Sequence, residues 1–139
     1  MTRFIDASVF IHAFLKTKRK LREHELAIKK RAKEIIRLVN EGEEVLMSTS
    51  HFSEIANILE DRMPLKEALE IEEAILLKEN IKVLSVSGED YLNSLEVAKE
   101  FDVGVNDALA YIIMQKQKIN EIYSFDRDFD RFPGIKRVV

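Results

Sequence analysis

Short apolar runs alternate with longer amphipathic stretches along this chain. The apolar runs predict strands, and the stretches in which apolar residues recur at helical spacing predict helices. The predicted strands are residues 2–5, 44–47, 81–84, 121–125 and 135–138, and the predicted helices are residues 7–16, 22–41, 50–61, 65–79, 88–101 and 106–117. This alternation favours an α/β fold, in which a central parallel sheet of about four to five strands is flanked by helices on both faces.

Two of the predicted helices carry more specific signals. Residues 88–101 begin like a capping box, with Ser87 as the N-cap and Asp90 at the third helical position. Residues 106–117 are apolar almost all round, which predicts a helix buried in the middle of the fold. The chain has no repeat and no linker rich in proline or glycine, so residues 1–139 are expected to form a single domain.

The composition excludes several classes of protein. Hydrophobic residues make up 46% of the chain, enough for a core, yet no apolar run approaches the ~18 residues needed to span a bilayer. The absence of cysteine excludes disulfides, thiolate catalysis and cysteine-based zinc sites. The N-terminus also lacks the apolar stretch of a signal peptide, so a cytoplasmic protein without membrane contact is expected.

Several carboxylates stand where a predicted strand ends or a predicted helix begins. They are Asp6, Glu54, Asp107 and Asp126. In open α/β sheets ligands bind at the carboxyl ends of the strands, so all four side chains can converge on one edge of the sheet. Such a cluster supplies the hard oxygen ligands that Mg²⁺ or Mn²⁺ prefers.

Each of these acids also has an ordinary structural explanation. Asp6 suits the N-cap of a helix, and Asp107 can complement a helix dipole. Asp126, Asp128 and Asp130 lie in a predicted turn, where aspartate is common. The interpretation as a metal site therefore depends on the whole set. His51 is three residues from Glu54, but the histidines show no metal-binding spacing, and the isolated glycines form no phosphate-binding loop.

Basic residues are concentrated between residues 16 and 33, although the net charge of −3 gives no global nucleic-acid signature. A solvated helix face explains such a run, and a surface that contacts RNA phosphates explains it as well. The candidate RNA contacts are Lys16, Lys18, Arg19, Lys29, Lys30 and Lys33.

In four segments the chain resembles the PIN-domain nucleases and, within them, the VapC-type toxins of toxin–antitoxin pairs. The segments are residues 4–9, 53–55, 106–110 and 124–129, the last followed by Pro133 and Gly134. Their order and spacing agree over essentially the whole chain.

The resemblance implies a PIN-like three-layer fold and a metal-binding, catalytic set of Asp6, Glu54, Asp107 and Asp126. It also implies that Ser8 and Ser124 support the first and last of these acids. Asp126 is favoured as the fourth acid because it directly follows the predicted strand. Asp128 and Asp130 are expected to face solvent or to pair with Arg127 and Arg131, and either could assist.

The resemblance further implies an Mg²⁺- or Mn²⁺-dependent endoribonuclease that acts as a toxin on RNA. A small VapB-like antitoxin would cover the site, and the toxin would form a homodimer. Two alternatives remain open, a housekeeping RNA-processing PIN nuclease and a catalytically inactive PIN module that binds RNA or protein. Retention of all four acids argues against the inactive module.

Overall fold

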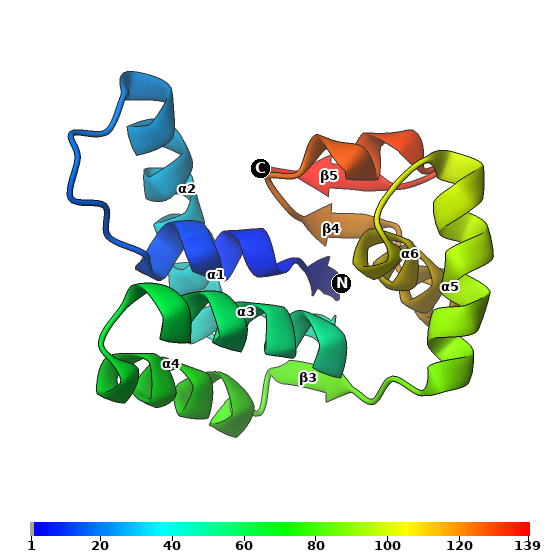
Figure 1. The fold of residues 1–139 in the computed structure, drawn as a ribbon, viewed down its shortest axis with the longest axis horizontal. Helices are drawn as coiled ribbons and strands as arrows, with labels where there is room; N and C mark the ends of the chain where they lie inside the picture. The colour runs from blue at the N-terminus through cyan, green and yellow to red at the C-terminus, as the bar shows by residue number, and fades with distance from the viewer. Residues whose placement is uncertain (1) are drawn as a thin grey trace.

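The computed structural model describes residues 2–139, which form one five-stranded sheet surrounded by helices (Figure 1). The strands are β1 (Arg3–Ile5), β2 (Val45–Ser48), β3 (Ile81–Leu84), β4 (Glu121–Tyr123) and β5 (Lys136–Val138). Every neighbouring pair is parallel, and the strand order is β3-β2-β1-β4-β5. The predicted parallel sheet is therefore confirmed.

Six α-helices connect the strands within residues 2–139. They are α1 (Ala7–Phe14), α2 (Glu23–Asn40), α3 (Thr49–Arg62), α4 (Leu65–Leu77), α5 (Gly88–Phe101) and α6 (Val105–Gln117). A short 3₁₀ helix that was not predicted, η1 (Arg127–Arg131), follows β4. The capping box of α5 is confirmed, because Ser87 Oγ accepts from Asp90 N at 3.1 Å and Asp90 Oδ2 accepts from Ser87 N at 2.8 Å. Among residues 2–139, no helix has the length and apolar character needed to cross a membrane.

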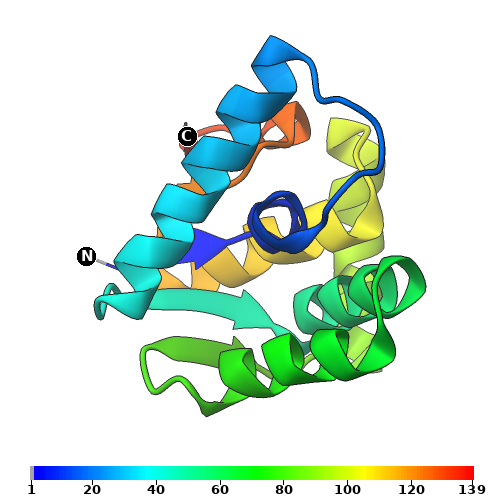
Figure 2. The ribbon, with the colours of Figure 1, turned by 90° about the vertical axis from the view of Figure 1, so that its left-hand side faces the viewer.

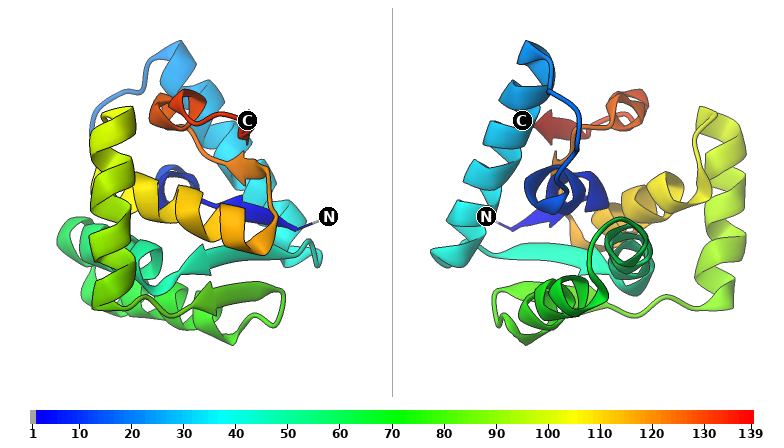
Figure 3. Two further views of the ribbon diagram at one scale, coloured as in Figure 1. Left: turned by 90° about the vertical axis from the view of Figure 1, so that its right-hand side faces the viewer. Right: turned by 60° about the vertical axis from the view of Figure 1, so that its left-hand side comes forward.

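Both faces of the sheet are buried, because successive strand residues point to opposite layers. Ile5 and Met47 belong to a core shared with α1, α2, α3 and α4. Phe4 and Leu46, their neighbours in the chain, belong to a second core shared with α6 and η1. Figure 3 shows α2 and α5 on opposite sides of the molecule. The predicted three-layer α/β/α arrangement is confirmed.

The strand order places a topological switch point between β1 and β4. The chain leaves β1 to build β2 and β3 on one side, and later returns to build β4 and β5 on the other. Asp6 follows β1 directly and its backbone N donates to Tyr123 O at 2.9 Å, so the ends of β1 and β4 lie side by side. Figure 2 shows α1 nearly end-on beside the tip of β1. Ligands of open α/β sheets bind at such switch points.

Candidate metal centre

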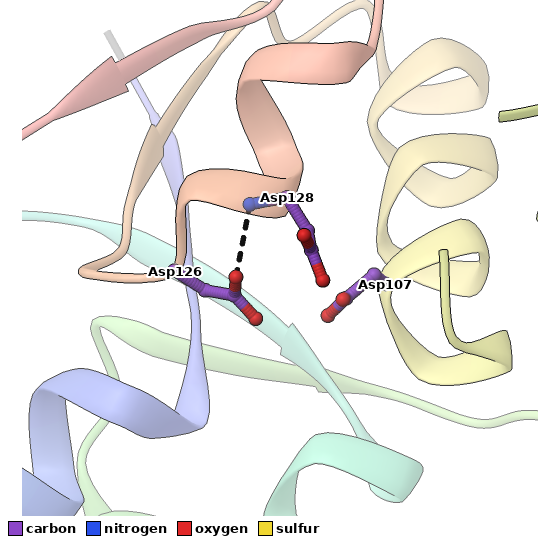
Figure 4. Close-up of side chains that lie close together, drawn as sticks. All are labelled: Asp107, Asp126 and Asp128. Atoms are coloured by element: carbon purple, nitrogen blue, oxygen red, sulfur yellow. Dashed lines mark hydrogen bonds between the residues drawn. The ribbon is translucent and has the colours of Figure 1, made fainter. Parts of the chain in front are cut away.

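Three aspartates converge at the switch point. Asp107 projects from the first turn of α6, whereas Asp126 and Asp128 come from the segment that begins η1. One carboxylate oxygen from each lies within 4.8 Å of those of the other two. Figure 4 shows the three side chains pointing toward one another across the space between α6 and η1. The fold therefore brings together acids that are about twenty residues apart in the sequence.

The chain between β4 and η1 builds its part of this cluster through a local hydrogen bond. Asp126 is the N-cap of η1, and its Oδ1 accepts from the backbone N of Asp128 at 2.9 Å (Figure 4). This is the usual way in which an aspartate stabilises a turn two residues ahead. The bond fixes the Asp126 side chain and leaves its second oxygen available for a ligand.

The structure corrects the expectation for Asp126 and agrees with the two expectations for Asp128. The strand ends at Tyr123, so Asp126 does not directly follow it, and Ser124 and Phe125 lie between. Asp128 keeps a loose contact with Arg131 at 3.9 Å, as expected, but its carboxylate also joins the cluster. The fourth acid of the predicted set therefore has a close companion.

Asp130 lies apart from the cluster. Its carboxylate is exposed and pairs with Arg137 of β5, with 3.1 Å between Asp130 Oδ1 and Arg137 Nε. Of the two expectations for Asp130, exposure to solvent is confirmed, but its ion-pair partner is Arg137 and not Arg127 or Arg131. The reason is tertiary, because β5 runs beside β4 and brings Arg137 to η1. Asp130 therefore has a structural partner of its own.

Asp6 is joined to the cluster by Ser124. Asp6 is 6% exposed, and its Oδ2 accepts a hydrogen bond from Ser124 Oγ at 2.8 Å. The same Oγ accepts from the backbone N of Asp126 at 3.0 Å, so one serine links the first and last acids of the predicted set. Asp6 occupies the N-cap position of α1, but its side chain makes no capping hydrogen bond. Helix capping therefore does not explain this aspartate.

Ser8 holds the same segment from the side of α1. Its Oγ accepts from Phe125 N at 3.1 Å and lies 3.5 Å from Ser124 Oγ. The two serines thus tie the chain after β4 to the start of α1. Both side chains lie where the resemblance implies supporting residues.

The remaining acid, Glu54, is half-buried in the second turn of α3. Burial raises its pKa first, and the charges of Asp6 and Asp126 raise it further. The effect on Asp107 is larger, since burial raises the pKa of its carboxyl to about 7, with added repulsion from Asp126, Asp6, Asp128 and Glu54 in that order. The negative charges of the neighbouring acids therefore make ionisation of Glu54 and Asp107 less favourable.

This donor set fits a hard divalent cation. All the ligands are carboxylate oxygens, and a bound cation would offset the burial and the repulsion that together raise the pKa of Asp107. Opposite ligands of Mg²⁺ are about 4 Å apart. The 4.8 Å span of Asp107, Asp126 and Asp128 is therefore close to the required size.

The basic candidates divide into two groups. Lys29 Nζ donates to His12 O at 3.1 Å and also to Leu15 O, so this ammonium satisfies carbonyls at the end of α1. Arg19 Nη2 pairs with Glu25 at 2.6 Å. The other four, Lys16, Lys18, Lys30 and Lys33, are exposed.

One buried residue near the acids has a more definite place than its sequence position suggested. His51 is fully buried, and hydrogen bonds tie its ring to Ser48 and to the backbone of Asn106, directly before Asp107. Burial lowers the pKa of His51, although Asp6 and the Asn106 carbonyl favour the charged form. The only signal in the sequence was its position three residues before Glu54.

The fold and the acidic cluster together define a class of protein: three-layer α/β domains that carry acids at the switch point of the sheet. The chain belongs to the PIN-domain family, because residues 3–135 match the model of that family. No curated protein matches the chain closely enough to count as a relative.

Two solved structures share the fold over nearly the whole chain. One is Mycobacterium tuberculosis VapC20, a sarcin–ricin loop cleaving toxin, with a TM-score of 0.72 and 22% identity over 94% of this chain and 93% of that one. The other is VapBC2 from Rickettsia felis, bound to a DNA fragment from their promoter. Its TM-score is 0.64, with 13% identity over 97% of this chain and 96% of that one. At these identities the likeness establishes the fold alone.

Proposed function

We propose that this protein is a metal-dependent endoribonuclease that hydrolyses RNA phosphodiester bonds with the help of Mg²⁺ or Mn²⁺. In this proposal Asp6, Glu54, Asp107 and Asp126 hold the metal, and Asp128 assists them. The observation that carries the proposal is the convergence of these acids at the switch point of a PIN domain.

The chemistry needs no nucleophile from the protein. A bound divalent cation lowers the pKa of a water molecule and neutralises the charge that develops on the phosphate. The protein orients its ligands through Ser124, which fixes Asp6 and the backbone of Asp126 at once. Asp107, whose pKa is about 7 in the free protein, would release its proton when a cation binds, so binding should strengthen as the pH rises.

Phosphate is repelled by the acids, so cationic side chains elsewhere must hold the RNA. We assign this role to the exposed lysines Lys16, Lys18, Lys30 and Lys33. Lys16 and Lys18 follow α1, whose eight residues extend about 12 Å from Asp6, and Lys30 and Lys33 lie on α2. Arg19 and Lys29 contribute charge to the same surface, but their side chains are held by Glu25 and by carbonyl groups of α1.

A cleavage assay tests the proposed activity. A labelled structured RNA is incubated with the protein in Mg²⁺ or Mn²⁺, and again with excess EDTA. Cleavage should require the metal and should be lost in Asp126→Asn. Asp61→Asn, the same change at an exposed site on α3, is the matched control and should cleave normally. Full cleavage in EDTA would refute the metal mechanism.

We further propose that the protein is the toxin of a VapBC-type pair and acts in the cytoplasm as a homodimer. Support comes from the shared fold of a sarcin–ricin loop cleaving toxin and of a VapBC assembly. An antitoxin that binds through an amphipathic helix would use an apolar groove. One of about 580 Å³ lies between α1, α2 and α4, lined by Phe10, Phe14, Ile36, Met63 and Ile71 among others.

Expression in a host cell tests the role as a toxin. Induction should arrest growth, Asp107→Asn should abolish the arrest, and co-expression of a short neighbouring reading frame should relieve it. Normal growth during production of a nuclease that is active in vitro would instead favour a housekeeping role. Sedimentation of the purified protein tests the homodimer independently.

A further inference from the structure

The imidazole of His51 makes a closed set of hydrogen bonds beside the acidic cluster. It is fully buried, and both ring nitrogens have partners. Nδ1 lies 2.6 Å from Ser48 Oγ, and Nε2 lies 3.1 Å from the carbonyl oxygen of Asn106. Buried polar groups are paired in this way in stable proteins, but here the second partner is 55 residues away in the sequence.

The partners determine which nitrogen carries the proton. A carbonyl only accepts, so Nε2 is protonated and donates to Asn106 O. Nδ1 of the neutral ring then accepts from the Ser48 hydroxyl, and Ser48 Oγ in turn accepts from His51 N at 3.2 Å as the N-cap of α3. Every donor in this set has one acceptor, so the ring can take only one orientation without losing a bond.

The ring contacts three elements that carry or precede the acids. It belongs to α3, which bears Glu54, and its bond to Asn106 fixes the peptide group from which Asp107 follows in α6. The Phe4 ring of β1 packs edge-on against it, with centroids 5.0 Å apart. A single side chain therefore joins the strand and the two helices around the cluster.

Apolar packing alone does not join these two helices. Ile55 and Leu59 of α3 belong to the core on one face of the sheet. Leu109 and Met114 of α6 belong to the core on the opposite face. The bond from His51 reaches from the layer of α3 to the layer of α6 around the end of the sheet, where repulsion between acids acts to separate them.

We propose that His51 is a positioning residue that sets the spacing between Glu54 and Asp107 by holding the Asn106 carbonyl. The inference rests on the proposed metal-dependent function. A small displacement of a ligand is enough to weaken a site of this kind, and residues that orient metal ligands typically change metal affinity or activity by about 10- to 100-fold.

Two substitutions at His51 separate positioning from packing. His51→Leu fills the site with an apolar side chain and removes the ring's hydrogen bonds to the Ser48 hydroxyl and the Asn106 carbonyl. His51→Gln keeps an N–H for Asn106 and an acceptor for Ser48. His24→Gln, in an exposed position on α2, is the control for the same chemical change. Each protein is compared in Mn²⁺ affinity by calorimetry, in kcat and KM for RNA, and in unfolding temperature in EDTA.

The expected result is a rise of about 10-fold or more in the Mn²⁺ Kd of His51→Leu, with a fall in kcat and little change in KM. His51→Gln should recover most of the affinity, and His24→Gln should match the wild type.

Wild-type affinity and kcat in a folded His51→Leu would overturn the inference while leaving the proposed function intact. If His51→Leu does not fold, the test passes to Ser48→Ala, which removes the hydrogen bond that orients the ring through Nδ1; wild-type Mn²⁺ affinity in that variant would overturn the inference. A wild-type protein that neither binds metal nor cleaves RNA would refute the function and the inference together.

Discussion

Replacing Asp107 by asparagine should abolish cleavage and yet stabilise the metal-free protein. Burial and four neighbouring acids raise the pKa of this carboxyl from 3.8 to about 7. The folded protein therefore binds this proton more tightly than the unfolded chain does. Stability is lost as the pH rises from about 4 to about 7, and the full penalty persists above that range. An asparagine side chain at this position would carry no such charge.

The size of the effect follows from this shift. Three units of pKa correspond to about 4 kcal/mol, which is a ceiling because Asp107 is partly exposed and shares its proton with its neighbours. Loss of a carboxylate from the first turn of α6 costs up to about 1 kcal/mol through the helix dipole. We therefore expect a net gain of about 1–2 kcal/mol at pH 8, or roughly 3–8 °C in unfolding temperature.

Urea and thermal unfolding in EDTA at pH 5 and pH 8 measure this gain, with Asp61→Asn as the control. The advantage of Asp107→Asn should be larger at pH 8. In saturating Mg²⁺ the order should reverse, because the metal stabilises only the protein that binds it. If Asp107→Asn is less stable than the wild type at pH 8 in EDTA, the carboxylate is a structural helix-start residue and the reasoning fails.

Three further predictions address other parts of the structure. Asp126→Asn should lower cleavage at fixed Mg²⁺ by at least 100-fold and Asp130→Asn by less than about threefold, because only the first is in the cluster; the opposite order would misplace the fourth acid. Charge reversal at Lys30 and Lys33 should weaken RNA binding and flatten its dependence on salt, with kcat unchanged. An unaltered salt slope in a filter-binding titration would show that these lysines only form a solvent-exposed face of α2. Glu72→Gln should raise the urea midpoint at pH 8 and raise it less at pH 4, since burial and the neighbouring Glu60 raise the pKa of the Glu72 carboxyl; equal urea midpoints at pH 8 would contradict this.

The layers of the fold could be predicted from the sequence because strands and helices differ in apolar period. The convergence of Asp6 and Glu54 on one edge also follows, since parallel strands share their carboxyl ends. The sequence does not predict which way side chains point in segments outside the regular helices and strands, such as the segment after β4. The backbone bond between Asp126 and Asp128 depends on η1, which no periodicity specifies. The pairing of Asp130 with Arg137 depends on how η1 lies beside β5, although β5 itself was predicted.

Tertiary partners explain the other differences. His51 looked incidental because its acceptor, Asn106, lies in another layer of the fold. Lys29 looked like an RNA contact because its sequence neighbours are basic, but the turn after α1 folds its ammonium back onto the His12 and Leu15 carbonyls. Composition shows where charges are plentiful, whereas only the packed structure shows which of them are already satisfied.

The metal centre is tested most directly by locating Mn²⁺ through its anomalous scattering in crystals of the wild-type protein. The signal should lie between the carboxylates of Asp107 and Asp126, and it should be absent or much weaker in crystals of Asp107→Asn grown in the same Mn²⁺. A saturated wild-type crystal with no signal at this cluster, or with Mn²⁺ only at other acids such as Glu60 and Glu72, would contradict the account.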